Sequence, residues 1–236
     1  MRVPLFLAAT FLAGPLLAAP QSGPSFDKEK LTYAVNWPSG LTLGEARLEA
    51  RKSAPAEAGT PRWSLDFFLD AAVPGFAVAD QFHSLTDDNG CSVEFEKNAL
   101  HGKKKAQERT TFDARKSTAT RTTLNGGGKT EISVSACAHD ALAFLYYLRR
   151  ELSQGRMPPA QAVLFGAPYQ FRAEYGGTRM LAIGESKIET DRLVGFAKGP
   201  ASDLTFEAFF ARDAVRTPVL IKVPLALGTF SMELVR

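Results

Sequence analysis

The sequence predicts a mainly β protein built on one strongly curved antiparallel sheet of about ten to twelve strands, with a single amphipathic helix covering its concave face. Short runs rich in aromatic and branched apolar residues, separated by Gly, Pro, Asn and Asp, recur over most of the 236 residues. One stretch, residues 140–152, instead has the periodicity of an amphipathic helix. Because a twisted sheet of that many strands curls or closes, the helix is the natural cover for its concave side.

The N-terminus has the pattern of a secretory signal peptide. Arg2 precedes an apolar run over residues 3–17, and small residues follow it. We expect residues 1–19 to be removed, with cleavage after Ala19 or, as the alternative, after Ala18. An uncleaved membrane anchor is the competing interpretation, but about 15 apolar residues interrupted by a Gly-Pro pair are short for a span.

Residues 20–29 are predicted to be a flexible segment and residues 30–236 a single β domain. The domain opens with the runs "KLTYAVNW" and "LTLGEARLEA" on either side of Pro-Ser-Gly, which predicts a hairpin. The alternation changes phase within the second run, which indicates a β-bulge near Gly44. Similar runs continue as an antiparallel meander. Beyond the helix, the runs 169–176 and 180–189 are interpreted as two strands.

The helix is expected to begin after Asp140, whose carboxylate is a good N-cap for the unpaired N–H groups of the first turn. Its apolar side chains gather into one stripe, which consists of Ala141, Phe144, Leu145, Leu148 and Leu152. Two interpretations stay open. The stripe fills the core of the sheet, or it is the inner face of a lid over a cavity for an apolar ligand.

The chain has two cysteines, Cys91 and Cys137, and its predicted signal peptide would direct it to an oxidising compartment. We expect them to form a disulfide, which in the chain-entropy model stabilises the fold by roughly 4 kcal/mol. The alternative is a reactive thiol at Cys137, just before the helix. No cysteine lies directly after the apolar run, where a lipid would be attached. We therefore expect a periplasmic or secreted protein that is not a lipoprotein and has no stable transmembrane segment after cleavage.

The sequence has no pattern that predicts catalysis, a cofactor or nucleic-acid binding. The net charge is only +3, which is too small for a nucleic-acid-binding surface. His83, His101 and His139 are too far apart for a short metal motif. The segment "LNGGGKT" lacks the first glycine of a phosphate loop and is expected to be a hairpin turn. We expect a protein that is not an enzyme.

A basic run, "HGKKKAQER" at residues 101–109, is the most concentrated positive charge in the chain. It is suited to acidic lipid headgroups, but a solvated hairpin is the usual explanation for such a run. Lysines on a hairpin also discourage edge-to-edge pairing of sheets.

Several segments appear in an order that resembles a known family. They are "LTYAVNWPSGLTLGEARL", "HDALAFLYYLRREL", "YQFRAEYGG" and "RDAVRTPVLIKVPLALGTFSMELV". Over roughly residues 30–235 the chain resembles the bacterial exported family called domain of unknown function 3108 (DUF3108). The resemblance implies a β half-barrel similar to the lipoprotein carriers LolA and LolB, and it implies no catalytic residues.

Two functions follow as expectations. The first is an exported envelope protein that binds or carries an amphipathic, lipid-like ligand. The alternative is a structural or interaction component of the envelope without a small-molecule ligand. The sequence names no protein partner. Unlike LolB, the chain has no cysteine for lipid attachment.

Overall fold

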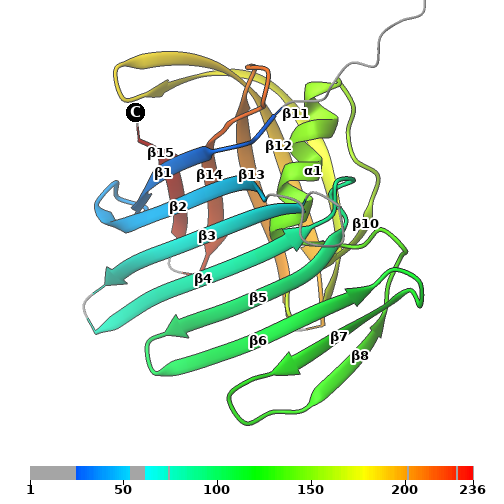
Figure 1. Cartoon of the computed structure of the whole chain (residues 1–236). Helices are drawn as coiled ribbons and strands as arrows, with labels where there is room; N and C mark the ends of the chain where they lie inside the picture. Colours follow the sequence, from blue (N-terminus) through cyan, green and yellow to red (C-terminus); the bar gives the residue numbers. More distant parts are fainter. Residues whose placement is uncertain (1–24, 54–61, 74, 201, 227, 236) are drawn as a thin grey trace, which may run out of the picture.

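A computed structural model describes residues 25–53, 62–73, 75–200, 202–226 and 228–235, so the predicted signal peptide lies outside the described residues. The fifteen described strands form one curved, unclosed sheet, with a single helix, α1, against its concave side (Figure 1). The elements are β1 (Glu29–Asn36), β2 (Thr42–Ser53), β3 (Arg62–Val73), β4 (Phe76–Thr86), β5 (Ser92–His101), β6 (Lys104–Asp113), β7 (Thr118–Thr123), β8 (Lys129–Ser133), β9 (His139–Asp140), α1 (Ala141–Ser153), β10 (Gln161–Leu164), β11 (Pro168–Ile183), β12 (Ser186–Lys198), β13 (Asp203–Ala211), β14 (Pro218–Leu225) and β15 (Gly228–Leu234).

The strands are arranged as two meanders joined in the middle of the sheet. The order runs from β8 at one edge back to β1, then from β15 back to β9 at the other edge. The junction is the antiparallel pair β1–β15, in which Tyr33 lies opposite Leu234. The predicted fold class is therefore confirmed, although the sheet has fifteen strands instead of about ten to twelve. No helix among the described residues is long and apolar enough to cross a membrane.

Four register shifts interrupt the strand pairing, in the β1–β2, β4–β5, β11–β12 and β13–β14 pairs, and one of them corrects a predicted boundary. Val35 pairs with Gly44 and the next residue pairs with Thr42, so the expected bulge is present. A Cβ at Gly44 would collide with the backbone of β3. The break between runs 169–176 and 180–189 is also a bulge within β11, not a turn. The turn lies at Gly184, whose positive φ of 55° suits glycine.

Asp140 fixes the start of α1 and is fully buried. Its Oδ1 accepts hydrogen bonds from the backbone N–H groups of Leu142 at 2.9 Å and Ala143 at 3.0 Å. Its Oδ2 accepts from the hydroxyls of Ser84 and Ser92, each at 2.6 Å. Burial raises the pKa of Asp140, and these hydrogen bonds partly offset that effect. The cap thus attaches the helix to β4 and β5.

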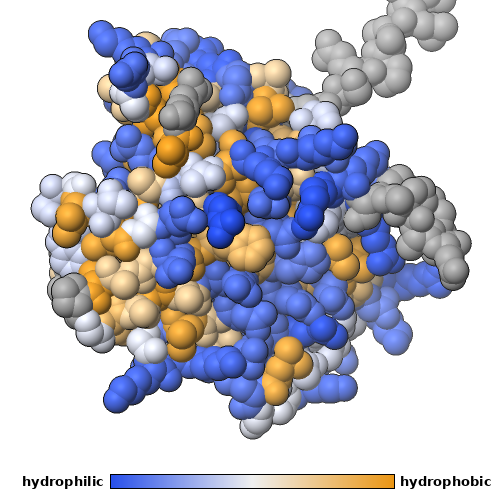
Figure 2. All heavy atoms as spheres, turned by 60° about the vertical axis from the view of Figure 1, so that its left-hand side comes forward, coloured by the Kyte–Doolittle hydropathy of each residue, from blue (hydrophilic) through white to orange (hydrophobic). Residues whose placement is uncertain are grey.

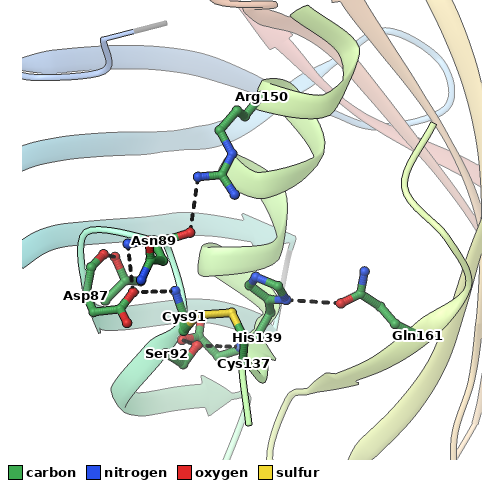
Figure 3. The surroundings of a disulfide bond; sticks show 10 residues. Asp87, Asn89, Cys91, Ser92, Cys137, His139, Arg150 and Gln161 are labelled. Carbon is green, nitrogen blue, oxygen red and sulfur yellow. Dashed lines mark hydrogen bonds between the residues drawn. A yellow bond between two sulfur atoms is a disulfide. The ribbon is translucent and has the colours of Figure 1, made fainter. Parts of the chain in front are cut away.

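A disulfide closes the same end of the helix (Figure 3). Cys91 and Cys137 are bonded with their Cα atoms 4.9 Å apart, so Cys137 is not a free thiol. The turn that carries Cys91 is ordered by Asp87, whose carboxylate accepts from the backbone N–H of Cys91 at 2.9 Å. Arg150 reaches from α1 to the same turn and donates to the carbonyl oxygen of Asn89.

The C-terminal half of α1 is held by a buried ion pair. The Arg149 side chain is fully buried and donates two hydrogen bonds to the Glu29 carboxylate, at 2.6 and 2.7 Å. Its Nε also donates to the carbonyl oxygens of Val215 and Arg216. The guanidinium lies 4.5 Å from the ring centroid of Phe26, which is buried. Phe26 and Glu29 therefore pack against the helix, whereas Ser25, Asp27 and Lys28 are exposed.

We predict that Asp140→Ala lowers the free energy of unfolding by roughly 3 to 5 kcal/mol, because it removes the helix cap and leaves two buried hydroxyls without their acceptor. Asp140→Asn keeps the capping oxygen and should cost less than half as much. Urea unfolding of both variants measures the difference. Equal losses for the two substitutions would show that the cap is not what holds the helix.

Candidate functional site

The helix covers only one end of the concave face. It packs against the end of β4 that carries Ser84 and the paired end of β3 that carries Leu65. A strand of eleven or twelve residues is about 36 to 40 Å long, whereas a helix is about 10 Å wide. Figure 1 shows α1 at the right-hand ends of these strands and no helix at their left-hand ends. The uncovered end contains the candidate site.

That end holds an open cavity of about 510 Å³ with an almost entirely apolar lining, hereafter the apolar pocket. Its size falls within the range of about 300 to 1,000 Å³ that is typical of small-molecule sites. The walls come from β1 to β4 on one side and from β14 and β15 on the other. The lining residues are Val35, Trp37, Leu43, Leu69, Ala71, Ala72, Val73, Phe76, Val78, Ile221, Val223, Leu225, Ala226, Phe230, Ser231 and Met232.

Strand alternation brings the side chains of every second residue into the apolar pocket. Leu69, Ala71 and Val73 occupy every second position of β3, and Ala71 lies opposite Val78 of β4. Across the cavity, Ile221 lies opposite Met232 in the β14–β15 pair. The pairing of β1 with β15 brings the two walls together, although they are far apart in the sequence.

The mouth of the apolar pocket lies at the β1–β2, β3–β4 and β14–β15 turns, because Trp37, Phe76 and Leu225 belong to its lining. Trp37 packs edge-on against Phe230, with ring centroids 4.9 Å apart. Phe76 and Leu225 are 47% and 53% exposed, although both are large and apolar. Figure 2 brings this side forward and shows apolar residues gathered at the left of the view, with hydrophilic residues below and to the right. The pocket is therefore open to solvent.

The five residues of the predicted helix stripe lie in the core and not in the apolar pocket. Phe144, Leu148 and Leu152 belong to a buried cluster with β10 to β13, and Ala141 and Leu145 pack at its margin. The opposite side of the helix is buried as well, through Leu142, Ala143 and Tyr146. Side chains thus fill the space between stripe and sheet, and the open cavity lies beyond the helix.

A smaller cavity of about 200 Å³ lies beside the helix, at the other end of the sheet. Trp63, Tyr146 and Tyr147 contribute aromatic walls, and Arg150 and Asp88 contribute charge. Its mixed lining makes it less suited to an apolar ligand than the apolar pocket.

The concave face continues from the apolar pocket onto a charged strip on β4 to β7. The register places Asp80, Lys97, His101, Glu108 and Arg121 on the same side of the sheet. The carboxylate of Asp80 is hydrogen-bonded to Nε2 of His101 at 2.9 Å. Burial raises the pKa of Asp80, and its interactions with His101 and Lys97 partly offset the increase. Polar groups therefore lie beside the apolar lining, as an amphipathic ligand requires.

The three histidines serve separate parts of the structure. His83 bonds to Asp66 at 2.7 Å on the outer face of the sheet, and this bond raises the pKa of His83. His101 belongs to the charged strip, and His139 stacks on Tyr147 with ring centroids 4.7 Å apart. Burial lowers the pKa of His139. The described part of the chain has no group of three or more His, Cys, Asp or Glu residues placed to hold a metal ion.

The apolar pocket was not predicted from the sequence, although some of its residues have unusual positions there. Trp37 and Phe76 both lie beside turn residues, where large apolar side chains are unusual. The pairing that brings Ile221 and Met232 into the same cavity has no local signal in the sequence.

Comparison with known proteins identifies a family and a fold. A family model described as "Protein of unknown function (DUF3108)" matches residues 32–235. A search of curated proteins finds no match. The crystal structure of a β-barrel-like protein of domain of unknown function DUF1849 from Brucella abortus is similar, with a TM-score of 0.62 and 9% identity over 89% of this chain and 97% of that one. This likeness concerns the fold alone.

A second solved structure, of a putative lipoprotein from Parabacteroides distasonis, has a TM-score of 0.34 and 7% identity over 90% of this chain and 95% of that one. At that TM-score the likeness carries no argument.

We predict that Leu148→Ala lowers the free energy of unfolding by about 2 to 5 kcal/mol, because Leu148 is only 6% exposed and its loss leaves a cavity. Leu145→Ala should cost less, since Leu145 is only partly buried. Chemical denaturation of both variants tests this order. A negligible cost for Leu148→Ala would mean that the helix moves as a lid and is not part of the core.

Proposed function

Because the chain belongs to the DUF3108 family, whose description assigns no activity, we propose from the site itself that this protein binds an amphipathic, lipid-like ligand with its apolar part in the apolar pocket. The observation that supports this proposal is an open cavity of about 510 Å³ lined almost wholly by carbon. Leaving such a surface in water is unfavourable, and an apolar ligand would relieve that cost. The charged strip beside the pocket would then face the polar part of the ligand.

The role we propose is binding and not catalysis. Among the described residues that line the apolar pocket, Ser231 has a hydroxyl and none has a titratable side chain. The nearest acid and base of the charged strip, Asp80 and His101, are bonded to each other. The competing function is a structural or interaction role in the envelope, in which another protein covers the same apolar surface.

We also propose that the protein is exported, periplasmic or secreted, and not lipid-anchored. The disulfide between Cys91 and Cys137 supports an oxidising compartment, because such bonds are rare in the reducing cytosol. The apolar run near the N-terminus supplies the export signal.

Mass spectrometry of the protein from its native cell envelope should find a mature chain that begins at Pro20, or at Ala19 if cleavage follows Ala18. Recovery of the chain with Met1 intact would contradict cleavage.

The two tryptophans allow a direct test of the ligand and of its location. Trp37 lines the apolar pocket, whereas Trp63 lines the small cavity beside the helix. In Trp63→Phe the remaining Trp37 should be quenched by a monomeric brominated fatty acid, because bromine atoms in the apolar pocket would contact it. In Trp37→Phe the remaining Trp63 should keep its fluorescence. Titrations of both variants measure the effect.

Val223→Glu, made in the Trp63→Phe chain, is the matched control. It places a carboxylate in the pocket wall and should abolish quenching of Trp37 without unfolding the protein, since Val223 is only partly buried. Quenching of Trp63 alone would move the site to the helix. Absence of quenching in either single-tryptophan chain would favour the structural or interaction role.

A further inference from the structure

We infer that the hairpin end of the sheet, around the mouth of the apolar pocket, docks onto an anionic lipid bilayer. This end comprises the β1–β2, β3–β4, β5–β6, β7–β8 and β14–β15 turns, which lie along the left and lower left of Figure 1. The inference concerns the outer rim, so it stands whether or not a ligand occupies the pocket.

Exposed apolar side chains are concentrated at this end. Among the described residues eight large hydrophobic side chains are exposed, and five of them lie at these turns or at the adjoining strand ends. The five are Leu41, Phe76, Leu100, Leu124 and Leu225. Single exposed apolar residues are ordinary, but several on neighbouring hairpins form a surface that avoids water. Apolar side chains on several separate turns can all insert into the interface of one bilayer.

Positive charge lies directly beside these apolar residues. The β5–β6 hairpin presents three exposed lysines, Lys103, Lys104 and Lys105. None of the three forms an ion pair with a described residue of the neighbouring strands. The carboxylate that faces this hairpin from β4, Asp80, is 8% exposed and already bonded to His101. The described residues therefore leave the positive charge of this hairpin without a neutralising ion pair.

The apolar and the basic parts form one continuous surface. A shallow groove beside the apolar pocket is lined by Val73 and Phe76 on one side and by His101, Lys103 and Lys104 on the other. Val73 and Phe76 also line the apolar pocket. The ring of Phe76 packs so closely on Gly102 that a Cβ there would lie 2.9 Å from it. Lysines next to an apolar rim match the headgroup and acyl layers of an anionic bilayer.

Charge complementarity favours this occupant over a second protein. Each basic residue near an anionic membrane surface strengthens binding about fivefold, so three lysines together contribute about a hundredfold. The contribution depends on anionic lipid and is screened by salt, which distinguishes it from a purely apolar contact.

The test is sedimentation of the full mature protein with vesicles of phosphatidylcholine, alone or mixed with an equal share of phosphatidylglycerol. We expect binding to the mixed vesicles only, and weaker binding at high salt. Replacement of Lys103, Lys104 and Lys105 by Gln should reduce affinity for the mixed vesicles about a hundredfold. Phe76→Ser with Leu225→Ser should reduce it about tenfold or more, through lost apolar insertion.

The matched control replaces Lys28, Lys52 and Lys116 by Gln. These lysines are also exposed, but they lie at the end of the sheet opposite the β5–β6 hairpin. The same loss of charge there should leave vesicle binding nearly unchanged. Circular dichroism establishes that each variant is folded. Equal losses for both lysine sets would reduce the effect to net charge and overturn the inference, as would absence of binding by the unaltered protein.

Failure of docking and failure of the proposed ligand site are distinguishable. Vesicle binding without quenching of Trp37 by the monomeric fatty acid would support the docking face and not the pocket. Quenching without vesicle binding would support the pocket and overturn the docking face.

Discussion

The buried carboxylate of Asp140 determines where the only helix among the described residues lies, and the rest of the architecture depends on that position. It joins the first turn of α1 to Ser84 of β4 and Ser92 of β5 through hydrogen bonds. Hydrogen bonds to a carboxylate are stronger than those between neutral groups. A sheet of fifteen strands has far more concave surface than one helix of thirteen residues can cover. Once the helix is fixed at one end of the strands, the other end stays open.

The two ends of the sheet consequently have different physical roles. At the helix end the disulfide, the Asp140 cap and the Arg149–Glu29 pair hold three separate parts of the chain together. Breaking a buried ion pair typically costs about 3 to 5 kcal/mol, because it leaves an uncompensated charge. With stability concentrated there, the hairpin end can leave apolar side chains such as Phe76 and Leu225 exposed without loss of the fold.

The sequence predicted the parts of the structure that depend on local chemistry. The fold class, the helix and its cap at Asp140 follow from periodicity and from the chemistry of a helix N-terminus. The disulfide follows from two cysteines in a chain whose N-terminus has the pattern of an export signal, and the bulge at Gly44 from a change of alternation. Parts that depend on distant pairing were not predicted. Arg149 looks like an ordinary surface residue until Glu29, which is 120 positions away, is placed beside it. The apolar pocket likewise needs the pairing of β1 with β15.

The unclosed sheet also explains why a binding site and a docking face would occur at the same end. In a small closed barrel, side chains fill the interior and are buried there. An unclosed sheet instead leaves the side chains on the concave face accessible near the hairpin turns. Residues at those ends must serve both the pocket and the rim, and Phe76 does so, since it lines the pocket, contacts the basic hairpin and is nearly half exposed. A ligand that entered from a bilayer at this rim would pass from acyl chains to the pocket lining with little exposure to water. Exposing the acyl chain to water is the main barrier to moving a lipid. Each methylene that leaves an apolar environment for water costs about 0.8 kcal/mol.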